Sequence, residues 1–123
     1  MAVPILKQGS FLIATIQAAL TDTDVLQLQD DVMTQVTRHR SRGIIVDVTA
    51  LDVMDSFVSR SLRNIAMMTR LRGAETVVVG IQPEVAFSMV QLGMSFEEVQ
   101  TALDLEEGLE LLHAARESGD SGG

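Results

Sequence analysis

The chain has 123 residues and a formal net charge of -8, with 17 Asp and Glu residues against 9 Lys and Arg residues. This length corresponds to one domain, and the acidic balance argues against a nucleic-acid-binding protein, which usually presents a basic surface. The absence of Cys excludes disulfides, thiolate chemistry and zinc–cysteine sites. Because no stretch has the roughly 18 apolar residues of a membrane helix and the first residues lack a secretory signal, we expect a cytoplasmic protein without a membrane partner.

Strand and helix patterns alternate along the chain. Runs of apolar and β-branched residues, bounded by turn signals, predict strands at 3–7, 11–16, 44–48 and 76–81, with a further brief edge strand at 95–99. Apolar residues three and four apart, or helix start and stop signals, predict helices at 22–42, 56–72, 83–93 and 104–116. Gly43 is expected to end the first of these helices, and Gly73 the second.

This order predicts an α/β fold. Strands that alternate with helices indicate a mixed, mostly parallel sheet with right-handed crossovers, about four helices and an antiparallel edge made by the first hairpin. We expect a single domain over residues 1–117, followed by a flexible Gly- and Ser-rich tail at 118–123.

Metal and nucleophilic chemistry find little support in the sequence. His39 and His113 fall on different predicted helices among polar neighbours, and neither belongs to a ligand pair with metal-binding spacing. Glycine-rich phosphate-binding loops are also absent. We therefore expect no metal, no cofactor and no catalytic residue. A small α/β enzyme using Asp47, Asp52 or Asp55 is a third hypothesis, but it has no His, Cys or cofactor motif to work with.

Ser56 is placed where a strand and a short acidic loop lead into a helix. In a parallel sheet this is the carboxyl edge, where functional groups of α/β folds gather. One interpretation is structural, because a Ser at a helix start caps free N–H groups. The other is phosphorylation, since a phosphate would meet those N–H groups and could pair with Arg60 one turn later. Asp52 and Asp55 would repel the added charge.

Other residues near Ser56 leave alternatives open. Ser59 and Ser61 are competing phosphate acceptors, and Ser59 has Arg63 four residues later. Seven arginines fall within residues 38–72, whereas the rest of the chain is strongly acidic: Arg38, Arg40, Arg42, Arg60, Arg63, Arg70 and Arg72. Such a charge separation could dock a partner or copies of the chain, or it could simply complement helix dipoles and maintain solubility.

Residues 44–57, IIVDVTALDVMDSF, resemble the phosphorylation-site region of the STAS family, named for sulfate transporters and anti-sigma factor antagonists. In that family an Asp-Ser pair lies at the start of the second helix, which implies that Ser56 accepts phosphate. Small anti-sigma factor antagonists often continue Asp-Ser-Ser-Gly, whereas this chain continues with Phe57 and Val58. The Asp-Ser-Phe motif, VGIQP at 79–83 and LGMSFEE at 92–98 are more similar to the small STAS-only scaffold proteins of the bacterial stressosome.

This resemblance implies a non-enzymatic scaffold and phosphoswitch. It implies homo-oligomers, co-assembly with an RsbR-type STAS co-scaffold, capture of an RsbT-type serine/threonine kinase and resetting by an RsbX-type phosphatase. Phosphorylation of Ser56 would release the kinase and so relay environmental stress. The residues expected to contact the kinase or scaffold surround that serine: Asp52, Asp55, Phe57, Ser59, Arg60 and Arg63. The alternative is a free anti-sigma factor antagonist that forms no large assembly.

Overall fold

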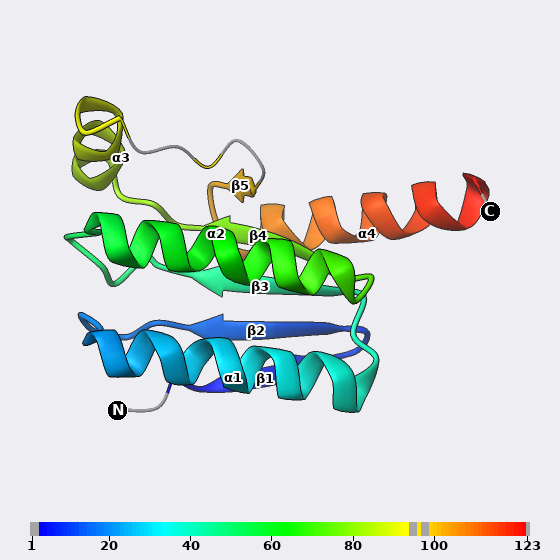
Figure 1. Ribbon diagram of the computed structural model, residues 1–123. Coiled ribbons are helices and arrows are strands. Elements are labelled where there is room, and N and C mark those ends of the chain that lie inside the picture. Colours follow the sequence, from blue (N-terminus) through cyan, green and yellow to red (C-terminus); the bar gives the residue numbers. More distant parts are fainter. Residues whose placement is uncertain (1–2, 94–95, 97–98, 123) are drawn as a thin grey trace.

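A mixed β-sheet forms the middle layer of the fold in the computed structural model, which describes residues 3–93, 96 and 99–122 (Figure 1). Within these residues five strands lie side by side in chain order: β1 (Ile5–Gln8), β2 (Phe11–Thr15), β3 (Gly43–Asp47), β4 (Glu75–Val79) and β5 (Gln100–Ala102). β1 is antiparallel to β2, and the remaining neighbours are parallel. The predicted α/β class, with a mostly parallel sheet and one antiparallel edge, is confirmed.

Helices cover both faces of this sheet. The described residues form four: α1 (Asp22–His39), α2 (Ser56–Leu71), α3 (Pro83–Gln91) and α4 (Leu105–Gly122). α1 and α2 lie side by side on one face, whereas α4 lies on the other and contacts β3, β4 and β5 (Figure 1).

Alternation along the strands divides the core between these two faces. Leu12, Ile44 and Val46 join the apolar stripe of α1 and the buried side of α2 in one cluster. Ile13 and Ile45, one position along each strand, point to the other face and pack under α4. This two-sided burial explains why the central strands read as continuous apolar runs.

The predicted end of the first helix is wrong. α1 ends at His39, not at residue 42, because Arg40 adopts a left-handed conformation with φ 48° and closes the helix. Gly43 is therefore not the helix stop; it is the first residue of β3, packed so tightly that a Cβ would lie 2.7 Å from Cδ2 of Leu112.

The last strand lies at Gln100–Ala102 and not at 95–99. Residues 95, 97 and 98 of the predicted strand are outside the described residues. Phe96 and Val99, whose apolar character suggested the strand, pack against the core on the α1–α2 side and do not pair with β4.

The last helix is longer than expected. α4 continues to Gly122, so helical backbone extends through residues 118–122, where the Gly and Ser content had suggested a tail. Extending an existing helix adds a hydrogen bond for each residue ordered, whereas starting one is the costly step.

Candidate functional site

The segment between β3 and α2 is anchored by its own apolar residues. Leu51 and Met54 point into the core, whereas Asp52 and Val53 are exposed, with Val53 73% exposed. At the start of the segment, the backbone N–H and the hydroxyl of Thr49 both donate to Oδ1 of Asp47, at 2.9 and 2.6 Å. These contacts give the loop one defined course between the strand and the helix.

A second loop, from β4 to α3, is held against the first. Nε2 of Gln82 donates to the backbone carbonyl of Thr49 at 2.6 Å. Gly80 adopts φ +80°, and a Cβ at this position would collide with the Thr49 side chain. Only a glycine accommodates both the positive φ and this close approach, so the VGIQP motif positions the loop that leads to Ser56.

Two neighbouring residues at the start of α2 differ in their contacts. Asp55 is the N-cap, and its Oδ1 accepts a hydrogen bond from the Val58 N–H at 2.8 Å. Ser56 is the next residue, is exposed, and its hydroxyl makes no hydrogen bond to any other residue that the structure describes. Asp55 therefore performs the capping that the structural interpretation assigned to Ser56.

The first turns of α2 sort the remaining candidates by exposure. Arg60 and Arg63 are exposed. Ser59 and Ser61 are buried, at 3% and 5% exposure, so their hydroxyls face the interior and not a kinase or a partner. The expected role of Ser59 as a phosphate acceptor or surface contact is incompatible with this burial.

The apolar residues near Ser56 differ in exposure from what the sequence suggested. Phe57 is half-buried and packs against the core, so only part of its ring remains for a partner. The exposed apolar residue beside Ser56 is Val53, which the sequence reading missed. Leu51 and Met54 in the same loop are buried, and the similar apolar character of these two residues and Val53 gives no sequence signal for which one is exposed.

Two carboxylates at this end of the sheet are engaged in local hydrogen bonds. Asp47 is engaged by Thr49 and Asp55 by the α2 backbone. Across the described residues, no group of three or more His, Asp or Glu side chains is arranged to hold a metal ion. The same residues contain no helix long and apolar enough to cross a membrane.

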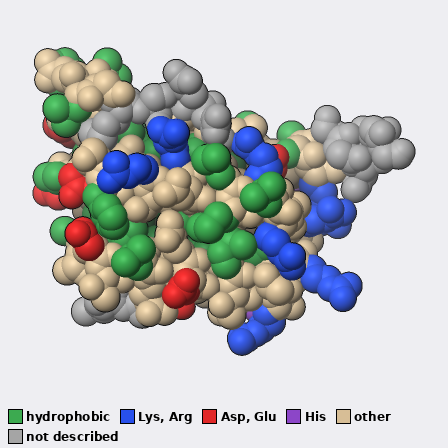
Figure 2. All heavy atoms as spheres, viewed as in Figure 1, with side chains coloured by type: hydrophobic (Ala, Val, Ile, Leu, Met, Phe, Trp, Pro, Cys, Tyr) green, Lys and Arg blue, Asp and Glu red, His purple; other side chains and the backbone are tan. Residues whose placement is uncertain are grey.

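Charged side chains are unevenly distributed over the face that carries α1 and α2. Figure 2 shows several basic groups where α1 and α2 end, whereas acidic groups lie together with basic groups near the start of α2. The added charge of a phosphate on Ser56 would thus enter a region that contains both acidic and basic side chains.

Comparison with known proteins identifies a matching family and similar structures. The STAS domain family matches residues 2–108. A serine-to-glutamate variant of RsbS from Moorella thermoacetica has a similar structure, with a TM-score of 0.81 and 33% identity, covering 94% of this chain and 97% of that chain. A second similar structure is described as the molecular architecture of the stressosome, a signal integration and transduction hub. Its matching chain has a TM-score of 0.78 and 34% identity, covering 92% of this chain and 98% of that chain.

A sequence relative is longer than this chain. RsbT co-antagonist protein RsbRA from Bacillus subtilis (strain 168) is 30% identical over 84 residues, which are 68% of this chain but 31% of RsbRA. The chain therefore spans less than a third of that relative, in contrast to its nearly complete overlap with RsbS.

Proposed function

The chain belongs to the STAS domain family and is of the stressosome type, and from this premise we propose that it is a non-enzymatic scaffold and phosphoswitch. In this proposal it co-assembles with an RsbR-type STAS co-scaffold and holds an RsbT-type serine/threonine kinase. Phosphorylation of Ser56 releases the kinase toward its effector, and an RsbX-type phosphatase resets the site.

The observation that carries the proposal is the exposed Ser56 hydroxyl beside a cap that does not need it. Because Oδ1 of Asp55 satisfies the Val58 N–H, a phosphate on Ser56 would leave the cap in place. The helix N-terminus and the guanidinium of Arg60 favour negative charge at this position. Phosphorylation should consequently change the surface and leave the fold intact.

Electrostatics supplies the release step. An unmodified Ser56 is neutral, and the kinase would bind over it and over the exposed Val53. A phosphate adds about -1.5 to -2 charges beside Asp52 and Asp55, so the docked surface would contain like charges that lose their water. Affinity for the kinase should fall for both reasons.

The test is kinase retention after phosphorylation. The complex of this chain with an RsbT-type kinase is immobilised, given ATP and a stimulus, and washed. We expect the unmodified sequence to release the kinase, Ser56→Ala to retain it, and Ser56→Asp to bind more weakly from the start. Ser88→Ala, which removes an exposed hydroxyl on α3, is the matched control and should release normally.

Two results would contradict the proposal. One is equal kinase affinity for the phosphorylated and unmodified chains, measured by titration calorimetry. The other is kinase-dependent phosphate on Ser59 with none on Ser56, detected by mass spectrometry of the digested complex.

A further inference from the structure

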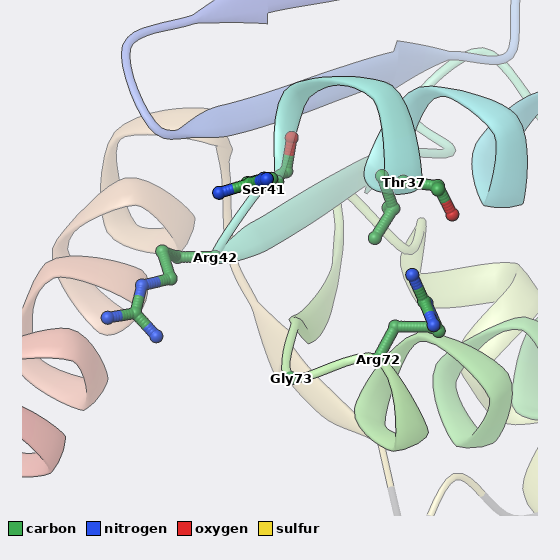
Figure 3. A pocket seen from close by; sticks show the side chains of 7 residues that line it. Thr37, Ser41, Arg42, Arg72 and Gly73 are labelled. Atoms are coloured by element: carbon green, nitrogen blue, oxygen red, sulfur yellow. The ribbon is translucent and has the colours of Figure 1, made fainter.

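A hollow of about 370 Å³ lies between the ends of α1 and α2 (Figure 3). It is next to the start of β3, whereas Ser56 follows the other end of that strand. Its lining comes from the end of α1, the start of β3 and the end of α2: Val36, Thr37, Arg40, Ser41, Arg42, Arg72 and Gly73. We propose that this hollow binds a phosphate group, presented either as free phosphate or as a small phosphate monoester.

Three arginines line the hollow, and two of them are the basis of the proposal. Arg40 follows α1, Arg42 leads into β3, and Arg72 follows α2. In Figure 3 the Arg72 side chain extends toward Thr37 across the space between the two helices, whereas Arg42 points toward α4. Arg72, together with Arg40, which also lines the hollow, is a principal ligand in the proposal. Guanidinium groups suit phosphate because their planar N–H pairs match its oxygens.

The charges of Arg40 and Arg72 are not neutralised within the molecule. In the parts of the chain that the structure describes, neither guanidinium has an ion-pair partner. Like charges around one hollow repel each other, so a doubly negative group between them would be stabilised. The exposed hydroxyl of Thr37 and the lining Ser41 add neutral donors at the same place.

The backbone of Arg40 adopts an unusual conformation that also supports the proposal. Arg40 is the only residue other than glycine with positive φ among those described, at 48°. An L side chain in this conformation costs roughly 1–2 kcal/mol, and glycine is the usual choice at such a helix end. A strained residue that keeps a charged side chain at the mouth of a hollow indicates a role for that side chain.

Complementing the helix dipoles does not account for the arrangement. The last turn of α1 already contains Arg38 and His39, and that of α2 contains Arg70. Arg38 and Arg70 provide cations on ordinary helical backbone, so Arg40 is not required there. Phosphate binding explains why a left-handed position carries an arginine and why Arg72 lines the same hollow.

The experiment is a titration of the full-length chain followed by the backbone amide resonances in ¹⁵N NMR. The probes are inorganic phosphate and glycerol 3-phosphate, with sodium chloride at matched ionic strength and glycerol as controls. We expect saturable shifts at Ser41 and Gly73 with either phosphate probe and none with the controls. Tighter binding of glycerol 3-phosphate identifies a monoester site, and equal or weaker binding identifies free phosphate as the ligand.

Three variants separate binding from folding. Arg40→Gly and Arg72→Gln should each weaken phosphate binding about tenfold or more, as expected for the loss of a charge-assisted contact. Because glycine fits the left-handed backbone, Arg40→Gly should keep or raise the melting temperature while it loses affinity. Lys7→Gln, which removes a positive charge from exposed β1, should bind as the parent does.

The proposal is overturned if phosphate gives no saturable shifts, or only the shifts that chloride gives. It is also overturned if Arg40→Gly and Arg72→Gln bind phosphate as tightly as the parent, or if Lys7→Gln weakens binding as much as they do.

Discussion

Adjacent side chains at the start of α2 differ in what they contribute to the structure. Asp55 caps the helix through its contact with the Val58 N–H, whereas the Ser56 hydroxyl faces solvent. A residue without a structural role is free to be modified, because adding a group there disturbs no native contact. The fold thus tolerates chemistry at Ser56 that it would not tolerate at Asp55.

The division predicts different stabilities for neighbouring variants. Asp55→Ala should lower the free energy of unfolding by about 1 kcal/mol, the usual cost of losing an N-cap. Ser56→Ala should change it by less than about 0.5 kcal/mol, as exposed substitutions do. Urea denaturation measures both, and Asp52→Ala, another exposed carboxylate in the same loop, is the control. Equal losses for Asp55→Ala and Ser56→Ala would contradict the assignment of the cap.

A buried hydroxyl pair connects α2 to β4. Oγ1 of Thr69 and Oγ1 of Thr76 lie 2.7 Å apart, and Thr69 also donates to the carbonyl of Ala66 at 3.0 Å. The pair is asymmetric, because Thr69 keeps a partner when Thr76 is removed. Within the described residues, Thr76 keeps none when Thr69 is removed.

We predict that Thr69→Val destabilises the protein by about 1–3 kcal/mol, the cost of an unsatisfied buried hydroxyl, and that Thr76→Val costs less. The double variant should recover part of the loss of Thr69→Val, since it leaves no hydroxyl unpaired. Urea denaturation of the three variants measures this order. Additive losses in the double variant would show that the hydroxyls act independently.

At the scale of the element, α4 depends on a close approach to the sheet. Gly108 lies on the inner side of the helix, and a Cβ there would be 2.8 Å from Cγ1 of Val79. Val79 is buried and β-branched, so its side chain has little freedom to move. The glycine lets α4 sit closer to β4 than any other residue would.

Gly108→Ala should therefore destabilise the protein, although alanine is the better helix former by about 1 kcal/mol. Overpacking a core contact typically costs about 1–3 kcal/mol, which we expect to exceed the gain in helix propensity. Thermal unfolding followed by circular dichroism provides the measurement. Glu110→Ala, on the exposed side of the same helix, should have little effect. An increase in melting temperature for Gly108→Ala would show that α4 can shift at little cost.

For the molecule as a whole, the proposed scaffold and a free anti-sigma factor antagonist differ in particle size. The STAS fold is compatible with both, because function resides in surfaces and not in the fold. Co-expressed with an RsbR-type partner, the chain should elute from size exclusion as a very large particle containing both proteins. Elution as a monomer or a small complex, with kinase binding intact, would favour the free antagonist.

The two regions proposed to be functional lie at opposite ends of the parallel strands. Ser56 is at the carboxyl edge with Asp52 and Asp55, and the hollow with Arg40 and Arg72 is at the other. A charge at one end is screened from the other beyond about 8 Å at physiological salt. Phosphate binding in the hollow and phosphorylation of Ser56 should thus be separable, and loss of one should leave the other.

The sequence by itself determined the alternation of strands and helices, the α/β class and the place of Ser56 at the head of α2. These features depend on apolar periodicity and on nearby start and stop signals, which are properties of neighbouring residues. The same local patterns could not decide which residue, Asp55 or Ser56, makes the cap, since either side chain is able to accept the hydrogen bond.

Only the tertiary structure decided which residues are buried and which residues far apart in the sequence lie close together. It turned Ser59 into the interior, exposed Val53, and ended α1 at a left-handed Arg40. It also brought Arg40 and Arg72, which are 32 positions apart in the sequence, to the two sides of one hollow. The burial of a residue and its contacts with distant residues depend on how α1 and α2 pack on the same face of the sheet. No local pattern of residues encodes that packing.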